Sequence, residues 1–280
     1  YSCDGYVNYL YGYMVPSTGF LTHYKMKLFA PGFIIQYPRA ECGGIIPEFE
    51  EDRTFGRTLK ESYQWAVKVG TETVSKINEY VLKNGSVDFI NMCESNHNNM
   101  LAELGKKIQQ DIDSIRLICI AGPSSSGKTT FANRLRIELL SLGIKPIRIS
   151  IDDYYKPKSE IPLDENGDVD LECLQALDTE LFNSDMLRLI NGEEVQLPRF
   201  DFKLGKRVPG RILKVDQNQP IIIEGIHALN DELTPDITKH QKFKIYIAPQ
   251  AQICLDNHNP LSLTDLRLLR RMVRDNKFRK

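Results

Sequence analysis

The stretch AGPSSSGKTT at residues 121–130 constrains this chain more than any other segment. Its spacing, in which Gly122 is followed four residues later by Gly127-Lys128-Thr129, is that of a phosphate-binding loop. In such a loop backbone N–H groups surround phosphate oxygens, the lysine reaches the terminal phosphates and the hydroxyl holds Mg²⁺. The alternative is a serine-rich surface turn, which requires neither a strand before it nor a helix after it.

Both flanking elements are predicted. Residues 116–121 form a short apolar run rich in strand formers, and residues 128–141 carry apolar residues at a roughly helical period. A helix that begins at the loop adds the partial positive charge of its N-terminus to the phosphate site. We therefore predict that the whole loop binds nucleotide phosphates through Gly122, Pro123, Ser124, Ser125, Ser126, Gly127, Lys128, Thr129 and Thr130.

Strands and helices alternate along the rest of the chain. Further strands are predicted at 146–151, 220–224 and 243–247, and further helices at 178–191 and 263–275. This alternation is typical of a parallel sheet with helices on both faces, so the predicted fold is an α/β three-layer αβα sandwich.

The segments before the loop differ in character. Residues 1–52 are rich in Tyr, Phe, Gly and Pro, and we predict a partial small α+β domain with strands at 25–30 and 33–37. Residues 53–112 are predicted to be a helical connector, with helices from Thr58 to about Leu82 and from about Asn98 to Gln110. The third domain covers residues 113–280.

Bulk composition excludes several classes of function. Lys and Arg number 36 against 37 Asp and Glu, so a net charge of −1 gives no electrostatic case for nucleic acid as a main partner. The six cysteines are scattered without Cys-x-x-Cys spacing, which favours free thiols in a reducing compartment. No apolar run approaches the roughly 18 residues of a membrane span, and no signal peptide opens the chain. We expect a cytoplasmic protein with no membrane partner, and homo-oligomerisation stays open.

Two acidic positions are candidates for chemistry. Asp152 and Asp153 follow the second predicted strand at the carboxyl edge, where open α/β sheets bind ligands. We predict that Asp152 orients an acceptor hydroxyl for phosphoryl transfer, whereas Asp153 is also explained by a cap or a turn. Glu224 ends a third apolar strand, and together with Thr129 it is predicted to serve Mg²⁺, directly or through water. Nearby His227 is better explained as a structural histidine with satisfied ring nitrogens, since the segment lacks other His or Cys ligands.

A row of arginines follows on the last predicted helix. Arg267, Arg270, Arg271 and Arg274 share one helical face at spacings of three, four and seven residues. Such a row is often a solvated or partner-binding surface. Beside a phosphate loop, a lid that neutralises the transferred phosphoryl group explains it better, with Arg270 and Arg274 converging on that group and Arg267 nearer the acceptor. Lys128, Asp152, Arg270 and Arg274 are therefore the predicted catalytic residues.

These segments together resemble the uridine kinase and phosphoribulokinase group of phosphate-loop kinases, over about residues 113–280. The resemblance rests on GPSSSGKTT, Ser150-Ile-Asp-Asp-Tyr-Tyr155, Glu224-Gly225 and the arginine-rich segment 267–275 in the family's order. It implies ATP and Mg²⁺ as cofactors, Asp152 on a sugar 5′-hydroxyl, Tyr155 in the nucleoside pocket, Glu172 on the ribose hydroxyls, and the arginine-rich helix as a lid. It also implies a further helix and strand after the lid, so we expect a domain truncated at its C-terminal end.

The chain departs from the family where the base is bound. Residues 198–207 lie where pyrimidine-specific members have a Tyr and a His on the base, and this sequence has Phe200 and Gly205 there. A pocket without those two hydrogen-bonding groups discriminates less between bases. The predicted substrate-binding residues are Tyr155, Glu172, Phe200, Arg207 and Arg267.

Residues 13–21 and 30–38 resemble the later part of a domain found in threonyl-tRNA synthetases, which composite members of this group carry ahead of the kinase. The sequence therefore predicts an ATP-dependent kinase that phosphorylates the 5′-hydroxyl of a small-molecule nucleoside. Two alternatives stay open. One is a related kinase of a sugar phosphate or pantothenate, and the other is a non-catalytic nucleotide-binding module with a regulatory or RNA-associated role.

Overall fold

The computed structural model describes residues 2–7, 12–29, 32–50, 53–248, 253–256, 259 and 261–278. The chain divides into two compact units, residues 1–60 and residues 61–280, and each is described by itself. The division falls inside helix α1 (Arg53–Lys68). The three domains expected at 1–52, 53–112 and 113–280 stay a prediction.

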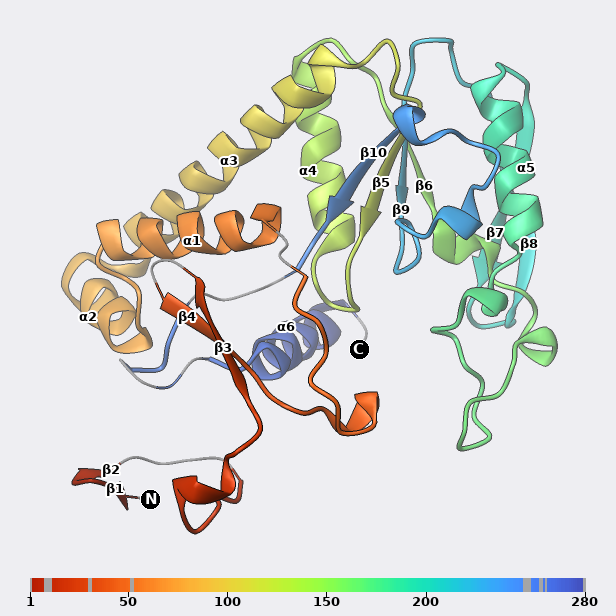
Figure 1. Cartoon of the computed structure of the whole chain (residues 1–280). Coiled ribbons are helices and arrows are strands. Elements are labelled where there is room, and N and C mark those ends of the chain that lie inside the picture. Colours follow the sequence, from red (N-terminus) through yellow and green to blue (C-terminus); the bar gives the residue numbers. More distant parts are fainter. Residues whose placement is uncertain are drawn as a thin grey trace. The chain divides into compact units, whose positions relative to one another are not determined.

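The larger unit is built on a four-stranded parallel sheet (Figure 1). Its strands lie in the order β10 (Lys242–Tyr246), β5 (Leu117–Ala121), β9 (Ile221–Glu224) and β6 (Ile147–Ser150). These four strands are the four predicted from the apolar runs, each within a few residues of its expected bounds. Because the strands are parallel, the residues after β5, β6 and β9 emerge at one edge of the sheet.

Alternating side chains of the sheet build a separate apolar core on each face. Ile118 and Ile120 of β5 pack with α3 (Ser86–Gln110) and α4 (Lys128–Ser141). Leu117 and the neighbouring odd-numbered positions pack against α5 (Thr179–Ile190). Figure 1 shows α4 on one side of the sheet and α5 on the other. The predicted three-layer αβα fold is therefore confirmed.

A hairpin that the sequence did not predict completes the α5 side. Strands β7 (Val195–Asp201) and β8 (Lys206–Leu213) are antiparallel, with a register shift between Gln196 and Pro198. Leu197 of this hairpin is buried in the same core as α5. The short 3₁₀ turns of the chain are Thr18–Phe20, Ala40–Cys42, Ile151–Tyr154, Lys158–Glu160, Leu174–Ala176, Asp231–Leu233 and Lys239–Gln241.

The helical connector differs from its prediction. The single helix expected from Thr58 to Leu82 is wrong, because α1 ends at Lys68 and α2 covers Val74–Asn84. Gly70 between them has a φ of 71°, a left-handed conformation that breaks a helix. Thr73 then caps α2 by accepting a hydrogen bond from the backbone N–H of Lys76 at 3.2 Å.

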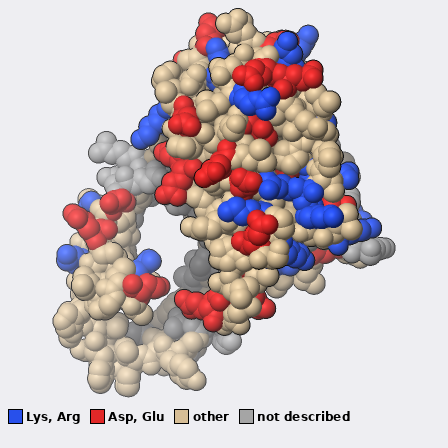
Figure 2. Space-filling view, turned by 90° about the vertical axis from the view of Figure 1, so that its right-hand side faces the viewer, with Lys and Arg blue, Asp and Glu red and all other residues tan. Residues whose placement is uncertain are grey.

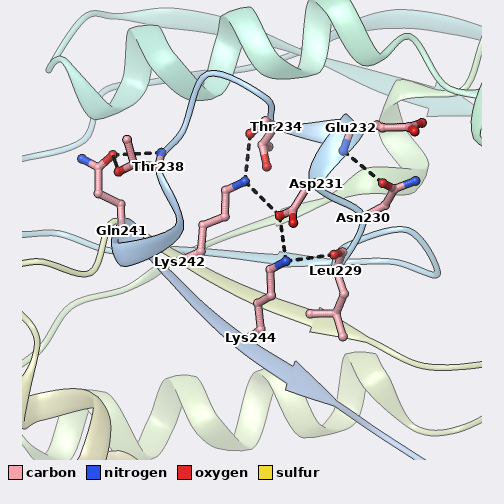
Figure 3. A network of polar contacts seen from close by, with 9 residues as sticks. All are labelled: Leu229, Asn230, Asp231, Glu232, Thr234, Thr238, Gln241, Lys242 and Lys244. Atoms are coloured by element: carbon pink, nitrogen blue, oxygen red, sulfur yellow. Dashed lines mark hydrogen bonds and ion pairs between the residues drawn. The ribbon is translucent and has the colours of Figure 1, made fainter. Parts of the chain in front are cut away.

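A polar network fixes the edge strand β10 to the segment after β9 (Figure 3). The almost fully buried Lys242 Nζ donates to the Thr234 carbonyl at 2.8 Å and lies 3.5 Å from Asp231 Oδ1. Lys244 Nζ donates to the same Asp231 oxygen at 2.7 Å. The Lys244 hydrogen bond, together with the charges of both lysines, holds the pKa of Asp231 below its usual value.

Backbone hydrogen bonds also hold the segment that leads to α6 (Leu263–Phe278). The N–H of Val74 donates to the Cys254 carbonyl at 2.9 Å, and the N–H of Cys254 donates to the Glu72 carbonyl at 3.2 Å. Five cysteines (Cys42, Cys93, Cys119, Cys173 and Cys254) carry free thiols, and burial raises the pKa of Cys119 to about 12. No helix in the described ranges is long and apolar enough to cross a membrane.

The smaller unit contains two short hairpins. Strands β1 (Ser2–Cys3) and β2 (Tyr6–Val7) pair antiparallel, as do β3 (Lys25–Phe29) and β4 (Gly32–Gln36). The strands expected at 25–30 and 33–37 are therefore confirmed, apart from Ala30, which lies outside the described residues. No side chain described in residues 2–60 is buried. This unit therefore shows no apolar core of its own within the described residues.

Candidate active site

The loop between β5 and α4 has a backbone that only small residues permit. A Cβ on Gly122 would lie 2.2 Å from the carbonyl oxygen of Ile247, a distance that no real side chain tolerates. Ser125 and Gly127 have φ values of 62° and 97°, in the left-handed region. Turns of this kind can direct successive N–H groups into one concave surface that suits an anion.

Lys128 lies across this loop. Its Nζ donates to the carbonyls of Gly122 at 2.9 Å and Pro123 at 3.2 Å. Burial lowers the pKa of Lys128, whereas the charges of Glu224 and Asp152 act in the opposite direction. The predicted phosphate-binding lysine therefore lies within electrostatic reach of both predicted acidic residues.

Two serine hydroxyls in the loop fit a phosphate ligand. Ser125 Oγ and Ser126 Oγ are buried and have no hydrogen-bond partner in the part of the chain that the structure describes. Buried hydroxyls normally have a partner, since leaving one unpaired costs about 1–3 kcal/mol. The residues present therefore fit a nucleotide phosphate in this loop.

The two residues predicted to serve the metal meet directly. Thr129 Oγ1 lies 3.0 Å from Glu224 Oε1 and 3.1 Å from Glu224 Oε2, and it donates to this carboxylate. Hydroxyl and carboxylate oxygens are hard ligands that suit Mg²⁺, which usually retains several waters and phosphate oxygens as well. Among the described residues there is no cluster of three or more His, Cys, Asp or Glu that could hold a metal by itself. The Thr129–Glu224 pair thus fits a Mg²⁺ ion whose other ligands are water and nucleotide phosphate better than it fits a metal ion held by protein ligands alone.

Asp152 and Asp153 lie in the 3₁₀ turn Ile151–Tyr154, after the strand has ended. Their side chains therefore need not point to opposite faces, as neighbouring side chains on a strand do. They nevertheless have different partners. Although the Asp152 side chain keeps solvent access, loss of part of its hydration raises its pKa, and the Glu224 carboxylate raises it further while Lys128 opposes. Asp153 Oδ1 instead accepts a hydrogen bond from the backbone N–H of Phe200 at 3.2 Å. Asp152 therefore belongs to the loop site, and Asp153 joins the turn to β7.

Aromatic rings gather beside Asp152. Tyr155 and Phe200 have ring centroids 5.8 Å apart, and Phe202 follows at 5.0 Å from Phe200. Burial raises the pKa of Tyr155 to about 12, and the charges of Asp152 and Glu172 contribute. The structure thus brings two of the predicted substrate-binding residues, Tyr155 and Phe200, near the predicted catalytic aspartate. Sequence reasoning missed Phe202, although its alternation with Phe200 could have indicated it.

The remaining predicted pocket residues have structural partners. The Tyr155 hydroxyl donates to the Leu171 carbonyl at 3.0 Å. Arg207 Nη1 donates to Asp178 Oδ2 at 2.7 Å, and Asp178 caps the N-terminus of α5. Gly205 forms the turn of the hairpin with a φ of 65°, a left-handed conformation that residues other than glycine seldom adopt. Glycine at this position therefore suits the conformation of the turn.

The arginines of α6 divide into two groups. Arg267 Nε donates to the Ser124 carbonyl at 3.2 Å, and Arg270 Nε donates to the Ser125 carbonyl at 3.1 Å. Arg274 Nε instead donates to Asp275 Oδ1 at 2.9 Å, while the largely exposed Arg271 lies 3.6 Å from Asp275 Oδ2. Two of the predicted lid arginines thus contact the loop itself, and Arg274 is paired within its own helix.

His227 differs from its expected role. It is half-buried, and its Nε2 is buried without a hydrogen-bond partner among the described residues. The interpretation as a histidine with satisfied ring nitrogens is therefore not supported at Nε2. The structure gives no reason for this unpaired atom.

Comparison with known proteins places this site in context. The sequence profile described as "Phosphoribulokinase / Uridine kinase family" matches residues 117–258. A uridine kinase of Halalkalibacterium halodurans is 30% identical over 159 residues, which are 57% of this chain and 66% of that protein. A protein of Arabidopsis thaliana named inorganic pyrophosphatase TTM2 is 36% identical over 128 residues, which are 46% of this chain and 18% of that protein.

The match covers 61% of a uridine kinase of Halobacterium salinarum, so the chain spans a little under two thirds of this protein and of the relative from Halalkalibacterium halodurans. Among solved structures, the "Structure of a Possible Uridine Kinase from Bacillus stearothermophilus" is 20% identical with a TM-score of 0.39. The superposition covers 61% of this chain and 96% of that one. The profile match contains Asp152, Glu224 and most of the loop site described above.

Proposed function

Because the chain belongs to the phosphoribulokinase and uridine kinase family, we propose that it transfers the γ-phosphoryl group of ATP to the 5′-hydroxyl of a nucleoside. The observation that carries this proposal is the convergence of Lys128, Asp152 and the Thr129–Glu224 pair at one edge of the sheet. A nucleotide-binding module without turnover needs the loop, but it does not need an acidic group beside it.

The chemistry follows from the charges of these side chains. Phosphoryl transfer has a loose transition state, so the attacking hydroxyl needs orientation more than early deprotonation. Asp152 would hold the acceptor hydroxyl in line, while Lys128 and Arg270 stabilise charge on the transferred oxygens. Thr129 and Glu224 would hold Mg²⁺, which neutralises phosphate charge when bound. Arg274 takes part only if it leaves Asp275 during turnover.

The aromatic cluster supports a nucleoside as the acceptor. The half-buried Tyr155 and the exposed Phe202 offer ring faces on which a base can stack, and the buried Phe200 packs against both rings. With Phe200 and Gly205 in place of hydrogen-bonding residues, the preference among bases should be shallow, within the roughly 100-fold that apolar pockets achieve. A sugar phosphate or pantothenate is the alternative acceptor, and it would use less of this aromatic surface.

The proposal is tested by measuring ADP release from Mg²⁺-ATP with the purified protein and a panel of uridine, cytidine, other nucleosides, sugar phosphates and pantothenate. We expect turnover with nucleosides, loss of nearly all turnover in Lys128→Ala, and unchanged turnover in the exposed control Arg188→Ala. Turnover only with a sugar phosphate or pantothenate would replace the acceptor. ATP binding without turnover on any acceptor, or a fully active Lys128→Ala protein, would overturn the kinase proposal.

A further inference from the structure

A second basic site lies away from the phosphate loop, in a pocket of about 630 Å³ between β6, α4 and the β7–β8 hairpin. We propose that this pocket binds a small phosphate ester, with its phosphate on arginines and its organic part against the apolar wall. The polar residues that line it are Asn133, Arg136, Arg148, Ser150, Asp153, Arg199 and Arg211. None of them belongs to residues 122–130 or to α6.

The pocket concentrates positive charge in a chain that is nearly neutral overall. Four arginines face one carboxylate, Asp153, whereas the whole chain has a net charge of −1. Burial raises the pKa of Asp153, and the charges of three of these arginines act against that rise. Figure 2, which looks at the side of the molecule where β7, β8 and α5 lie in Figure 1, shows Lys and Arg side chains gathered in a band.

The guanidinium groups keep donors available for a ligand. Arg148 Nη1 donates to Asn133 Oδ1 at 2.9 Å, and Arg211 donates to the Arg148 carbonyl. Each guanidinium has five N–H donors, so these contacts orient the groups without exhausting them. Within the part of the chain that the structure describes, none of the four arginines forms an ion pair with a carboxylate. A phosphate, which accepts paired hydrogen bonds from arginine, would supply the missing negative charge.

The remaining lining indicates an organic ligand and not a bare ion. Apolar side chains of β6 and the hairpin, including Ile149 and Leu197, form part of the wall. The pocket volume lies within the range of about 300–1,000 Å³ that small-molecule sites occupy. β6 is the edge strand of the sheet, and no other strand of the sheet pairs with its outer side in the described residues. The pocket is therefore suited to a molecule such as a nucleoside monophosphate or a phosphorylated sugar.

Binding to this pocket is measured without turnover. A failure to bind would therefore leave the proposed kinase activity unaffected, and a failure of the kinase proposal would leave the binding proposal unaffected. The full chain carrying Lys128→Ala, which weakens phosphate binding at the loop, is titrated calorimetrically with UMP, ribose 5-phosphate and inorganic pyrophosphate. We expect saturable binding of at least one phosphate ester at one site per chain. Tighter binding of UMP than of ribose 5-phosphate would identify a nucleotide site, and the reverse order a sugar phosphate site.

The arginines are then tested in the same background. Arg199→Ala with Arg211→Ala should weaken binding at least about 10-fold, and Arg136→Gln should weaken it without touching the hairpin. The matched control is Arg188→Ala, an exposed arginine on α5 outside the pocket. Circular dichroism confirms that each variant is folded. Equal affinity in the pocket variants and the control, or arginine-dependent binding of a short RNA but of no phosphate ester, would overturn the proposal.

Discussion

At the scale of single residues, Asp152 lies beside the phosphate loop at a position where its negative charge is unfavourable to the fold. Its pKa is raised by the loss of part of its hydration and by the Glu224 carboxylate, which means that the folded protein disfavours the ionised form. Above the ordinary aspartate pKa of about 4, this ionised carboxylate therefore lowers the stability of the fold. The penalty is relieved as the pH falls through the raised pKa. A carboxyl group whose pKa is shifted by its surroundings in this way is typical of functional sites.

The first prediction is that Asp152→Asn lowers kcat at least about 100-fold with a modest change in the KM for ATP, because the acceptor loses its orienting carboxylate. The same variant should melt at an equal or higher temperature than the parent at pH 7, and this difference should vanish below about pH 4. Steady-state kinetics and thermal melts from pH 3 to pH 8 measure both effects.

Asp153→Asn is the matched control for this substitution. It removes the negative charge of the carboxylate that accepts from the Phe200 N–H and lies among the arginines, and it leaves the carboxylate beside Glu224 unchanged. We expect a smaller loss of kcat than for Asp152→Asn. A larger loss of kcat in Asp153→Asn would show that the acceptor lies on the hairpin side of the turn.

At the scale of elements, buried parallel strands were the easiest feature to predict. The runs that became β5 and β9 are continuous and apolar because both faces of each strand are covered. The β7–β8 hairpin was missed because Pro198 and Pro209 interrupt its pattern, and only part of one face is buried. Its pairing depends on Gly205 and on packing against α5, which no local pattern contains.

The candidate site shows the same limit. The loop and Glu224 follow from spacing, since a motif and a strand end place them at one edge of the sheet. Sequence reasoning could not reveal that Arg274 pairs with Asp275 or that Arg207 pairs with Asp178. Such pairings depend on which carboxylate the fold brings within reach, and not on the spacing of the arginines.

The second prediction concerns α6 as a lid. Arg270→Ala should depress kcat for every acceptor alike by about 10²–10³, because a charge contact beside the loop is lost. Arg271→Ala, on the exposed side of the same helix, should have little effect. Arg267→Ala should mainly change the order of preference among acceptors, because Arg267 is predicted to lie nearer the acceptor. Kinetics on two acceptors distinguish these outcomes, and equal effects of Arg270→Ala and Arg271→Ala would argue against a lid.

The third prediction concerns the attachment of β10 to the rest of the sheet. Asp231 accepts hydrogen bonds from Lys244 and the almost fully buried Lys242, and its folded-state pKa is lowered. The stabilisation is therefore present above the unfolded pKa of about 4 and is lost as the pH falls through the lower folded value. Asp231→Asn should lower the melting temperature by a few degrees at pH 7 and by much less at pH 3.

The control for Asp231→Asn is Glu232→Gln, which changes a neighbouring carboxylate outside the lysine pair. The melting temperature of this control should stay within about one degree of the parent. A constant deficit of Asp231→Asn from pH 7 to pH 3 would show that the carboxylate charge is not the source of the stability.

At the scale of the whole molecule, apolar burial is distributed unevenly. Both buried cores lie in residues 61–280, and the central strands β5 and β9 are almost completely inaccessible to solvent. In residues 2–60, by contrast, no described side chain is buried. Since apolar burial is the main source of stability, the larger unit should hold nearly all of the cooperative stability that this chain has.

The last prediction follows from this distribution and is measured by native-state hydrogen exchange. Amides of β5 and β9 should exchange slowest, through unfolding of the whole larger unit, whereas amides of the β3–β4 hairpin should exchange through local opening. Mg²⁺-ATP at 100 times its dissociation constant stabilises the protein that binds it by about 2.7 kcal/mol. Exchange in β5 and β9 should therefore slow by about 100-fold, with no change in β3 and β4. Equal slowing in all four strands would show that residues 1–60 unfold together with the nucleotide-binding unit.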